Sequence, residues 1–158
     1  MRNLFEILAG MLILATPASA QTAVSRVPKL IAAKVVVASN GARSMSVSGD
    51  ETVDFCAKFR LSARDVRDYF ASAQQVNSQA YNHDLDMSRC HASGTVRFTN
   101  GWQGQWTIDL MRRGSLRLAN GRRFFFYCVD CTSIKFDPLT DEDREIGREL
   151  IRASRILK

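Results

Sequence analysis

Apolar and polar residues alternate in four short runs between residues 90 and 131. The runs are separated by turn signals at Asn100-Gly101, at residues 112–114 and at Asn120-Gly121. Asn-Gly between alternating runs favours a type I′ turn, which requires positive φ at both central residues. The pattern therefore predicts an antiparallel meander of four strands. The side chains expected to face its core are Val96, Phe98, Trp106, Ile108, Leu110, Leu116, Leu118, Phe124 and Phe126.

A further strand is predicted at residues 51–61, where apolar and polar residues alternate over most of the stretch. Period two over this length is typical of a half-buried strand. The alternation places Cys56 on the polar face of that strand, away from the apolar side chains. The partner of Cys56 is therefore expected to cross the outside of the sheet.

Residues 30–38 are apolar apart from Lys34, and three consecutive valines at positions 35–37 favour a strand over a helix. A turn is expected next, at residues 39–41. A weak strand is expected around Met45 and Val47, which alternate with serines.

A helix is predicted to begin at Ser62. Ser62 and Asp65 have the spacing of a capping box, in which each side chain bonds to the other residue's backbone N–H. Apolar residues then recur at spacings of three and four, which is typical of an amphipathic helix. These residues are Val66, Phe70, Ala73 and Val76. The helix is expected to end at Asn77 or Ser78.

A second helix is predicted at the C-terminus, beginning near Thr140 and Asp143, which also have capping-box spacing. Acidic residues occupy its first turns and basic residues its last, as the helix dipole favours. Its apolar stripe is expected to be Ile146, Leu150, Ala153 and Leu157. We expect this helix to dock on the sheet; the alternative is that it binds a partner or a membrane surface.

These elements predict an α+β fold. An antiparallel meander of four to five strands packs on one helix, and a C-terminal amphipathic helix is added to it. Over about residues 51–131, the order of strand, helix and four meandering strands resembles the cystatin-like roll. The resemblance implies a sheet wrapped on a helix. No cystatin inhibitory motif is present, so it implies no functional residue.

Residues 1–20 have the pattern of a secretory signal peptide. Arg2 is followed by an apolar run and then by the small residues Ala18-Ser19-Ala20, which is a typical cleavage site. The apolar run is shorter than the roughly 20 residues that cross a bilayer, and no later segment is long enough. We therefore expect residues 21–158 to form a single exported domain, either periplasmic or secreted, with no transmembrane segment.

Four cysteines lie within this exported part: Cys56, Cys90, Cys128 and Cys131. An even number of cysteines in an oxidising compartment indicates two disulfides. Of the three possible pairings, we favour Cys56 with Cys90 and Cys128 with Cys131. A bridge between residues only three apart requires the chain to turn at positions 129–130, because an extended strand would hold them too far apart.

The chain carries a formal net charge of +6 at neutral pH, which favours acidic partners. Candidates are an acidic protein, an anionic lipid or lipopolysaccharide phosphate, and an acidic glycan. The basic residues form no long run, and we do not expect a nucleic-acid partner.

Cys128-Val-Asp-Cys131 also matches the C-x-x-C spacing of thiol–disulfide oxidoreductases. The motif follows a meander strand rather than opening a helix, which favours a structural disulfide. No phosphate-binding loop and no G-x-S-x-G motif are present in the sequence. The histidines and aspartates of residues 81–91 fit no metal-ligand spacing, so we expect neither a metal nor another cofactor.

The sequence favours a small exported binding protein over an enzyme: an inhibitor, an immunity-type protein or an envelope accessory factor with a protein partner. The alternatives are a thiol–disulfide oxidoreductase using Cys128 and Cys131, and a basic lipid- or glycan-binding factor. Alternation places Arg117, Arg123, Phe125 and Tyr127 on the outer face of the last two strands. With Trp102 at the first turn, these five side chains form the candidate binding surface. The C-terminal helix could instead cover Phe125 and Tyr127.

Overall fold

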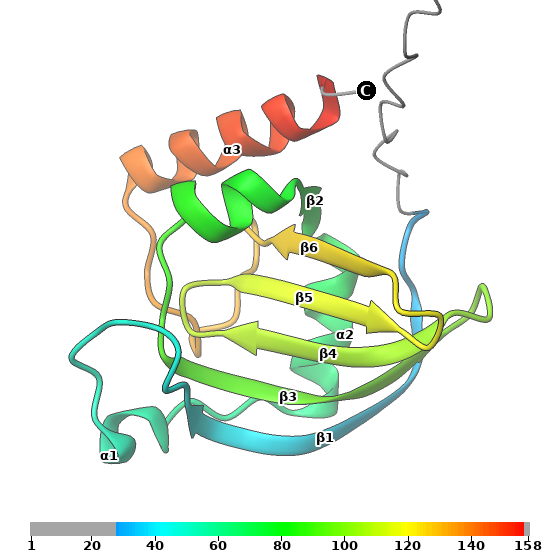
Figure 1. Cartoon of the computed structure of the whole chain (residues 1–158), viewed down its shortest axis with the longest axis horizontal. Coiled ribbons are helices and arrows are strands. Elements are labelled where there is room, and N and C mark those ends of the chain that lie inside the picture. The colour runs from blue at the N-terminus through cyan, green and yellow to red at the C-terminus, as the bar shows by residue number, and fades with distance from the viewer. Residues whose placement is uncertain (1–27, 157–158) are drawn as a thin grey trace, which may run out of the picture.

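The computed structural model describes residues 28–156, and its centre is one six-stranded antiparallel sheet with the strand order β1-β3-β4-β5-β6-β2 (Figure 1). Helices flank the sheet, which confirms the predicted α+β fold. The strands are β1 (Ala32–Arg43), β2 (Gln74–Val76), β3 (Cys90–Phe98), β4 (Gln103–Asp109), β5 (Arg113–Leu118) and β6 (Arg123–Tyr127). The helices are α1 (Val53–Cys56), α2 (Ala63–Ser72), the single π-helical turn η1 (Ala80–Asp84) and α3 (Asp141–Ile156).

Strands β3 to β6 form the predicted meander, but its turns are not of the predicted type I′. Gly101 and Gly121 have φ of 86° and 85°, whereas Asn100 and Asn120 are not among the described residues with positive φ. The Gly101 N–H donates to the Phe98 carbonyl at 3.1 Å, and the Phe98 N–H donates to the Trp102 carbonyl at 2.8 Å. This pattern is a type I turn followed by a left-handed glycine, the usual geometry of a three-residue hairpin loop.

The turn between β4 and β5 comprises residues 110–112, two positions before the predicted one. Arg112 takes the left-handed position that glycine fills in the other turns, with φ of 67°. Its side chain compensates for this conformation: Nε donates to the Asp137 carbonyl at 3.1 Å and Nη1 donates to the Cys131 carbonyl at 2.7 Å. The turn therefore also fixes the segment that follows β6.

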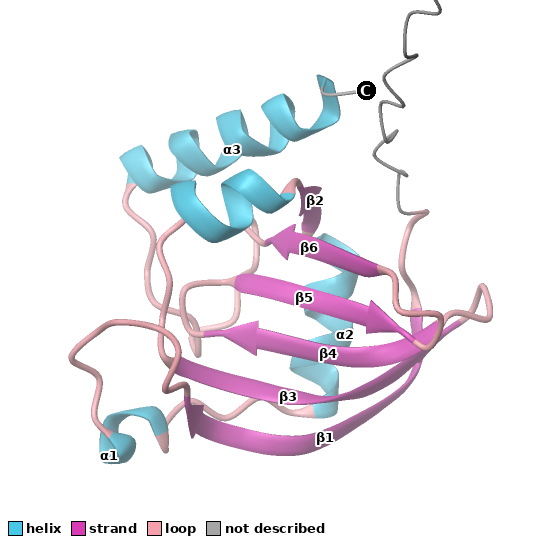
Figure 2. Ribbon diagram, viewed as in Figure 1, coloured by secondary structure: helices cyan, strands magenta, loops and turns pink. Residues whose placement is uncertain are grey.

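Helix α2 packs against one face of the sheet, here called the inner face (Figure 2). Its buried residues are Val66, Tyr69 and Phe70, and the Phe70 ring meets the Phe98 ring edge-on at 5.3 Å. The buried Tyr69 hydroxyl donates to the Arg112 carbonyl at 3.0 Å. Gly114 lies directly beneath the Tyr69 ring, where a Cβ atom would overlap it. The core thus depends on a side chain being absent at this point of β5.

The predicted capping box of α2 is confirmed, since Ser62 and Asp65 each accept the other's backbone N–H. The helix ends at Ser72, earlier than predicted. Residues 74–76 leave it to form β2, which pairs with β6. Val76 is therefore buried as a strand residue beside Phe125 and not as part of a helical stripe.

The strand predicted at residues 51–61 is wrong. Thr52 caps a helical turn at α1, and the Cys56 and Ala57 N–H groups donate to carbonyls four residues earlier. Val53 and Phe55, which occupy apolar positions of the predicted half-buried strand, are 64% and 48% exposed. A helical turn has a different period from a strand, so the alternating residues do not share a face.

The strand predicted at residues 30–38 is confirmed as part of β1, which continues to Arg43. The turn expected at residues 39–41 is instead an irregularity within β1, where the register with β3 shifts between Ser39 and Ala42. Gly41 has φ of 63°, and a Cβ there would overlap the backbone of Cys56 and Ala57. The weak strand expected around residues 45–47 is also wrong, because those residues form bends.

Helix α3 begins with the predicted Thr140–Asp143 cap, but its buried face differs from the predicted stripe. The buried residues are Gly147, Ile151 and Ser154, whereas Ile146 is 45% exposed. Leu157 lies outside the described residues. Small residues let the helix approach closely: a Cβ at Gly147 would overlap the Tyr127 ring. The Asn77 N–H donates to the Ser154 hydroxyl at 2.9 Å. The helix therefore docks beside β6 and β2.

We predict that Gly121→Val lowers the free energy of unfolding by about 1–3 kcal/mol because a β-branched residue is strained at positive φ. No atom lies within 4 Å of the added Cβ, so backbone strain alone is tested. Chemical denaturation measures the change, and Gly121→Asn is the matched control, since Asn tolerates this conformation. Equal losses in both variants would contradict the assigned turn.

Asp65 links the start of α2 to the segment after β6. Burial alone would raise the pKa of this carboxylate, but hydrogen bonds from Lys135 and Ser62 outweigh it and lower the pKa to about 2. The Lys135 ammonium lies 2.8 Å from Oδ2. Asp65 therefore stabilises the folded state above its unfolded pKa of about 3.9, and that contribution disappears as the pH falls toward 2.

We predict that Asp65→Asn lowers stability at pH 7 and flattens the loss of stability between pH 4 and pH 2. Urea denaturation at a series of pH values measures both effects. The exposed Asp68 provides a matched control through Asp68→Asn. A parallel pH profile for Asp65→Asn and the parent would show that this carboxylate is not the acid-sensitive link.

Candidate functional site

The outer face of the sheet, opposite α2, is covered around Phe125 and Tyr127 of β6 and is open from Arg123 of β6 across to β1. Tyr127 is 5% exposed and lies beneath α3. Phe125 is half-buried, and its ring stacks on the Tyr81 ring of η1 with the centroids 4.3 Å apart. The cover therefore consists of η1 and α3, and it ends at these aromatic residues.

A buried ion pair fixes η1 to this face. The Asp109 carboxylate accepts the backbone N–H of Arg113 at 3.0 Å and its Nε at 2.9 Å. The same guanidinium donates through Nη1 to the Tyr81 carbonyl at 2.6 Å and lies 4.7 Å from the centre of the Tyr81 ring. Burial raises the pKa of Asp109 to about 6, against the opposing effect of the Arg113 charge.

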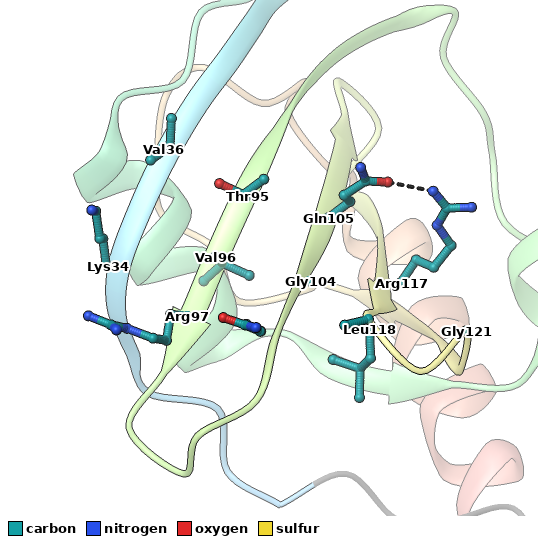
Figure 3. Close-up of a pocket in the computed structure, with 12 residues that line it drawn as sticks. Lys34, Val36, Thr95, Val96, Arg97, Gly104, Gln105, Arg117, Leu118 and Gly121 are labelled. Carbon is teal, nitrogen blue, oxygen red and sulfur yellow. Dashed lines mark hydrogen bonds between the residues drawn. The ribbon is translucent and has the colours of Figure 1, made fainter.

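The open half of the outer face contains two cross-strand rows of mostly polar side chains (Figure 3). The registers of β1, β3 and β4 align the first basic row, which is Lys34, Arg97 and Gln103. The registers of β1, β3, β4, β5 and β6 align the second basic row, which is Val36, Thr95, Gln105, Arg117 and Arg123. All of these residues are exposed, and none of them is acidic.

Each basic row sets two like charges directly opposite each other. Lys34 pairs with Arg97 across β1 and β3, and Arg117 pairs with Arg123 across β5 and β6. Like charges at directly opposite positions of an antiparallel pair are destabilising. Among the described residues, none of these four side chains has a carboxylate within ion-pair distance. Arg117 donates instead to the Gln105 side chain at 2.6 Å (Figure 3). The rows thus form an uncompensated positive surface.

An open groove of about 630 Å³ runs across β1, β3, β4 and β5 over these rows. Lys34, Arg97 and Arg117 line it, together with the side-chain amides of Gln103 and Gln105. No acidic residue contributes to its lining. Guanidinium, ammonium and amide N–H groups are donors suited to carboxylate or phosphate oxygens.

The structure separates the five binding residues that the sequence predicts. Arg117 and Arg123 are exposed in the open half, whereas Phe125 and Tyr127 belong to the covered half. Trp102 is half-buried and stacks on Phe124 at 5.3 Å, at the far end of the hairpins. The binding role of all five stays a prediction.

Sequence reasoning missed Lys34, Arg97 and Gln105 as parts of this surface. A local signal existed for Arg97 and Gln105, since each alternates with core residues of its own strand. No local signal existed for Lys34, because its position opposite Arg97 depends on pairing between strands that are distant in the sequence.

Both favoured disulfides are present, joining Cys56 to Cys90 and Cys128 to Cys131. The route predicted for the first bridge is wrong: Cys56 ends α1 and is fully buried, so Cys90 does not reach it across the outside of the sheet. Cys128 is also fully buried and Cys131 is half-buried, directly after β6. Thiol–disulfide exchange at this pair stays a prediction.

No protein-family model, curated protein or solved structure matches this chain. Within residues 28–156, no helix has both the length and the apolar character needed to cross a membrane. The signal peptide expected at residues 1–20 lies outside the described residues.

We predict that Arg123→Glu raises the free energy of unfolding by roughly 0.2–1 kcal/mol, because it replaces a like-charge pair with an opposite-charge pair facing Arg117. Denaturation at low salt measures the gain, which should shrink as salt is added. Arg123→Gln removes the repulsion without adding an attraction and should lie between the two. A destabilised Arg123→Glu protein would mean that Arg123 has a structural role.

Proposed function

We propose that the protein is a small exported, disulfide-bonded binding protein, and that the open half of its outer face binds an acidic partner protein. The partner presents carboxylates to the two basic rows. The protein acts by binding to that partner, as an inhibitor, an immunity-type protein or an envelope accessory factor does.

The observation that carries the proposal is the pairing of like charges in both basic rows. Lys34 opposite Arg97, and Arg117 opposite Arg123, lower the stability of the isolated sheet. A partner with carboxylates opposite these pairs would turn each repulsion into an attraction. Arginine is also enriched among the interface residues that contribute most to binding.

The shape and chemistry of the open half favour a protein over a glycan or a lipid. The surface is a broad sheet face with an exposed valine, Val36, at the β1 end of the second basic row, and interfaces commonly combine apolar and charged contacts. No aromatic ring lies within the two rows to stack on a sugar. Among the described residues, no amphipathic helix lies on this surface, although such a helix is a common means of interfacial lipid binding.

Export is supported by two observations of different kinds. The first is the signal-peptide pattern of residues 1–20. The second is the pair of disulfides, because such bonds persist in oxidising compartments. A periplasmic or secreted site of action follows from the proposal.

We predict that tagged residues 21–158 capture a specific protein from the envelope of the source cell, and that Arg117→Glu with Arg123→Glu abolishes the capture. Mass spectrometry identifies the captured protein. The purified pair should then associate more slowly as salt rises, because charge complementarity acts on association. The matched control is Arg64→Glu with Arg67→Glu, which makes the same charge change on exposed positions of α2.

Loss of capture in the control as well would indicate a dependence on net charge and would contradict a specific site. The parent protein could instead capture no protein but bind anionic vesicles or an acidic polysaccharide. If that binding is lost in the Arg117 and Arg123 variant, the open half binds those ligands and not a protein. A reductase assay with Cys131→Ser as its control tests the thiol–disulfide alternative separately.

A further inference from the structure

We propose that the partner binds by strand addition: an extended segment with alternating acidic and apolar residues pairs with the free edge of β1. This inference rests on the proposed function and specifies how the same open half receives its partner.

Strand β1 is an edge of the sheet, and although α2 packs against it, part of that edge forms no backbone hydrogen bond with any described segment other than β3. Near Gly41 the backbone of Cys56 and Ala57 lies against β1, and Asn40 exchanges hydrogen bonds with the Leu61 backbone. In Figure 2, α1 lies near this end of β1 and away from the other end. Over residues 33–38, no described backbone group outside β3 bonds to β1. The uncovered length matches a typical strand of about five to six residues.

The direction of the backbone groups follows from the hydrogen bonds of β3. The Phe98 N–H donates to the Trp102 carbonyl, toward β4, whereas the Thr99 N–H donates to the Ile31 carbonyl, toward β1. Because bonding directions alternate along an antiparallel strand, Thr95 and Arg97 bond toward β1.

The residues of β1 opposite Thr95 and Arg97 are Val36 and Lys34, which therefore bond toward β3. Val35, between them, and Val37 then direct their N–H and C=O groups to the free edge. A strand added there would satisfy backbone groups that the described fold leaves unpaired.

The side chains on either side of this edge specify the segment that would fit. Lys34 and Val36 lie on the outer face, and Lys34 is the only charged residue of positions 33–38. Val35 and Val37 are half-buried and pack against the core on the inner face. An added strand would place acidic residues beside Lys34 and apolar residues beside Val35 and Val37, so it must alternate acidic with apolar residues.

Along the open stretch, the features that usually prevent strand addition are limited to one lysine, Lys34, and to irregular pairing at the two ends. Native edges are commonly protected by several charges, by proline or by a bulge. The irregularities of β1 lie at the two ends of the open stretch, between Ala32 and Lys34 and again between Val37 and Ser39, and leave residues 34–37 regularly paired. A second copy of the chain would bring another net positive charge to the same place, which disfavours self-pairing.

The test uses residues 21–158 and a synthetic nonapeptide of alternating glutamate and valine, followed by amide hydrogen exchange in NMR spectra. We expect the peptide to bind and to slow exchange of the Val35 and Val37 N–H groups by about tenfold or more, because new hydrogen bonds protect them. The matched control peptide alternates lysine with valine and should give no protection. Lys34→Glu should remove the preference for glutamate without loss of fold.

Binding of the glutamate peptide without protection of Val35 and Val37 would overturn strand addition. So would equal binding of both peptides, or a dimer in ultracentrifugation whose β1 amides are already protected. These results would leave the proposed function standing if envelope capture still depends on Arg117 and Arg123. Capture that is independent of those arginines would remove the proposed function itself.

Discussion

The buried ion pair between Asp109 and Arg113 is the interaction on which the division of the outer face depends. An ion pair removed from water is stable only if its remaining hydrogen-bonding groups are satisfied. Here the backbone N–H of Arg113 and the Tyr81 carbonyl meet that requirement, and the bond to Tyr81 holds η1 over the pair. Since η1 rests on the β6 side, α3 packs beside it and the β1 side is left uncovered. The ion pair thus lies at the boundary between the half of the outer face that η1 and α3 cover and the half that is accessible.

Features set by neighbouring residues could be predicted from the sequence. The hairpins of the meander, the Ser62 cap of α2 and the Thr140 cap of α3 depend on residues close in the chain. Features set by distant packing could not. Residues 51–61 alternate as a strand does, yet Cys56 ends a helical turn that is tied to Cys90. The buried face of α3 follows small residues such as Gly147, and an apolar stripe cannot reveal that.

The candidate site divides in the same way. Alternation within a strand placed Arg117 and Arg123 on the outer face, and the registers agree with that placement. The contribution of Lys34 depends on the register between β1 and β3, which no local pattern determines. The covering of Tyr127 also depends on a non-local contact, with Gly147. The periodicity of a strand predicts which face of the sheet a side chain lies on. Its neighbours on adjacent strands depend on how distant parts of the chain pair.

The exposed edge of β1 has a consequence for the behaviour of the protein in concentrated solution. Unprotected edges of identical chains can join into extended sheets, and the valines of this edge favour such assembly. The positive charges beside the edge oppose it, because they repel every other copy of the chain. That repulsion acts over only about 8 Å at physiological ionic strength. The charges that destabilise the sheet are therefore expected to keep copies of the chain apart, and to do so less well as salt screens them.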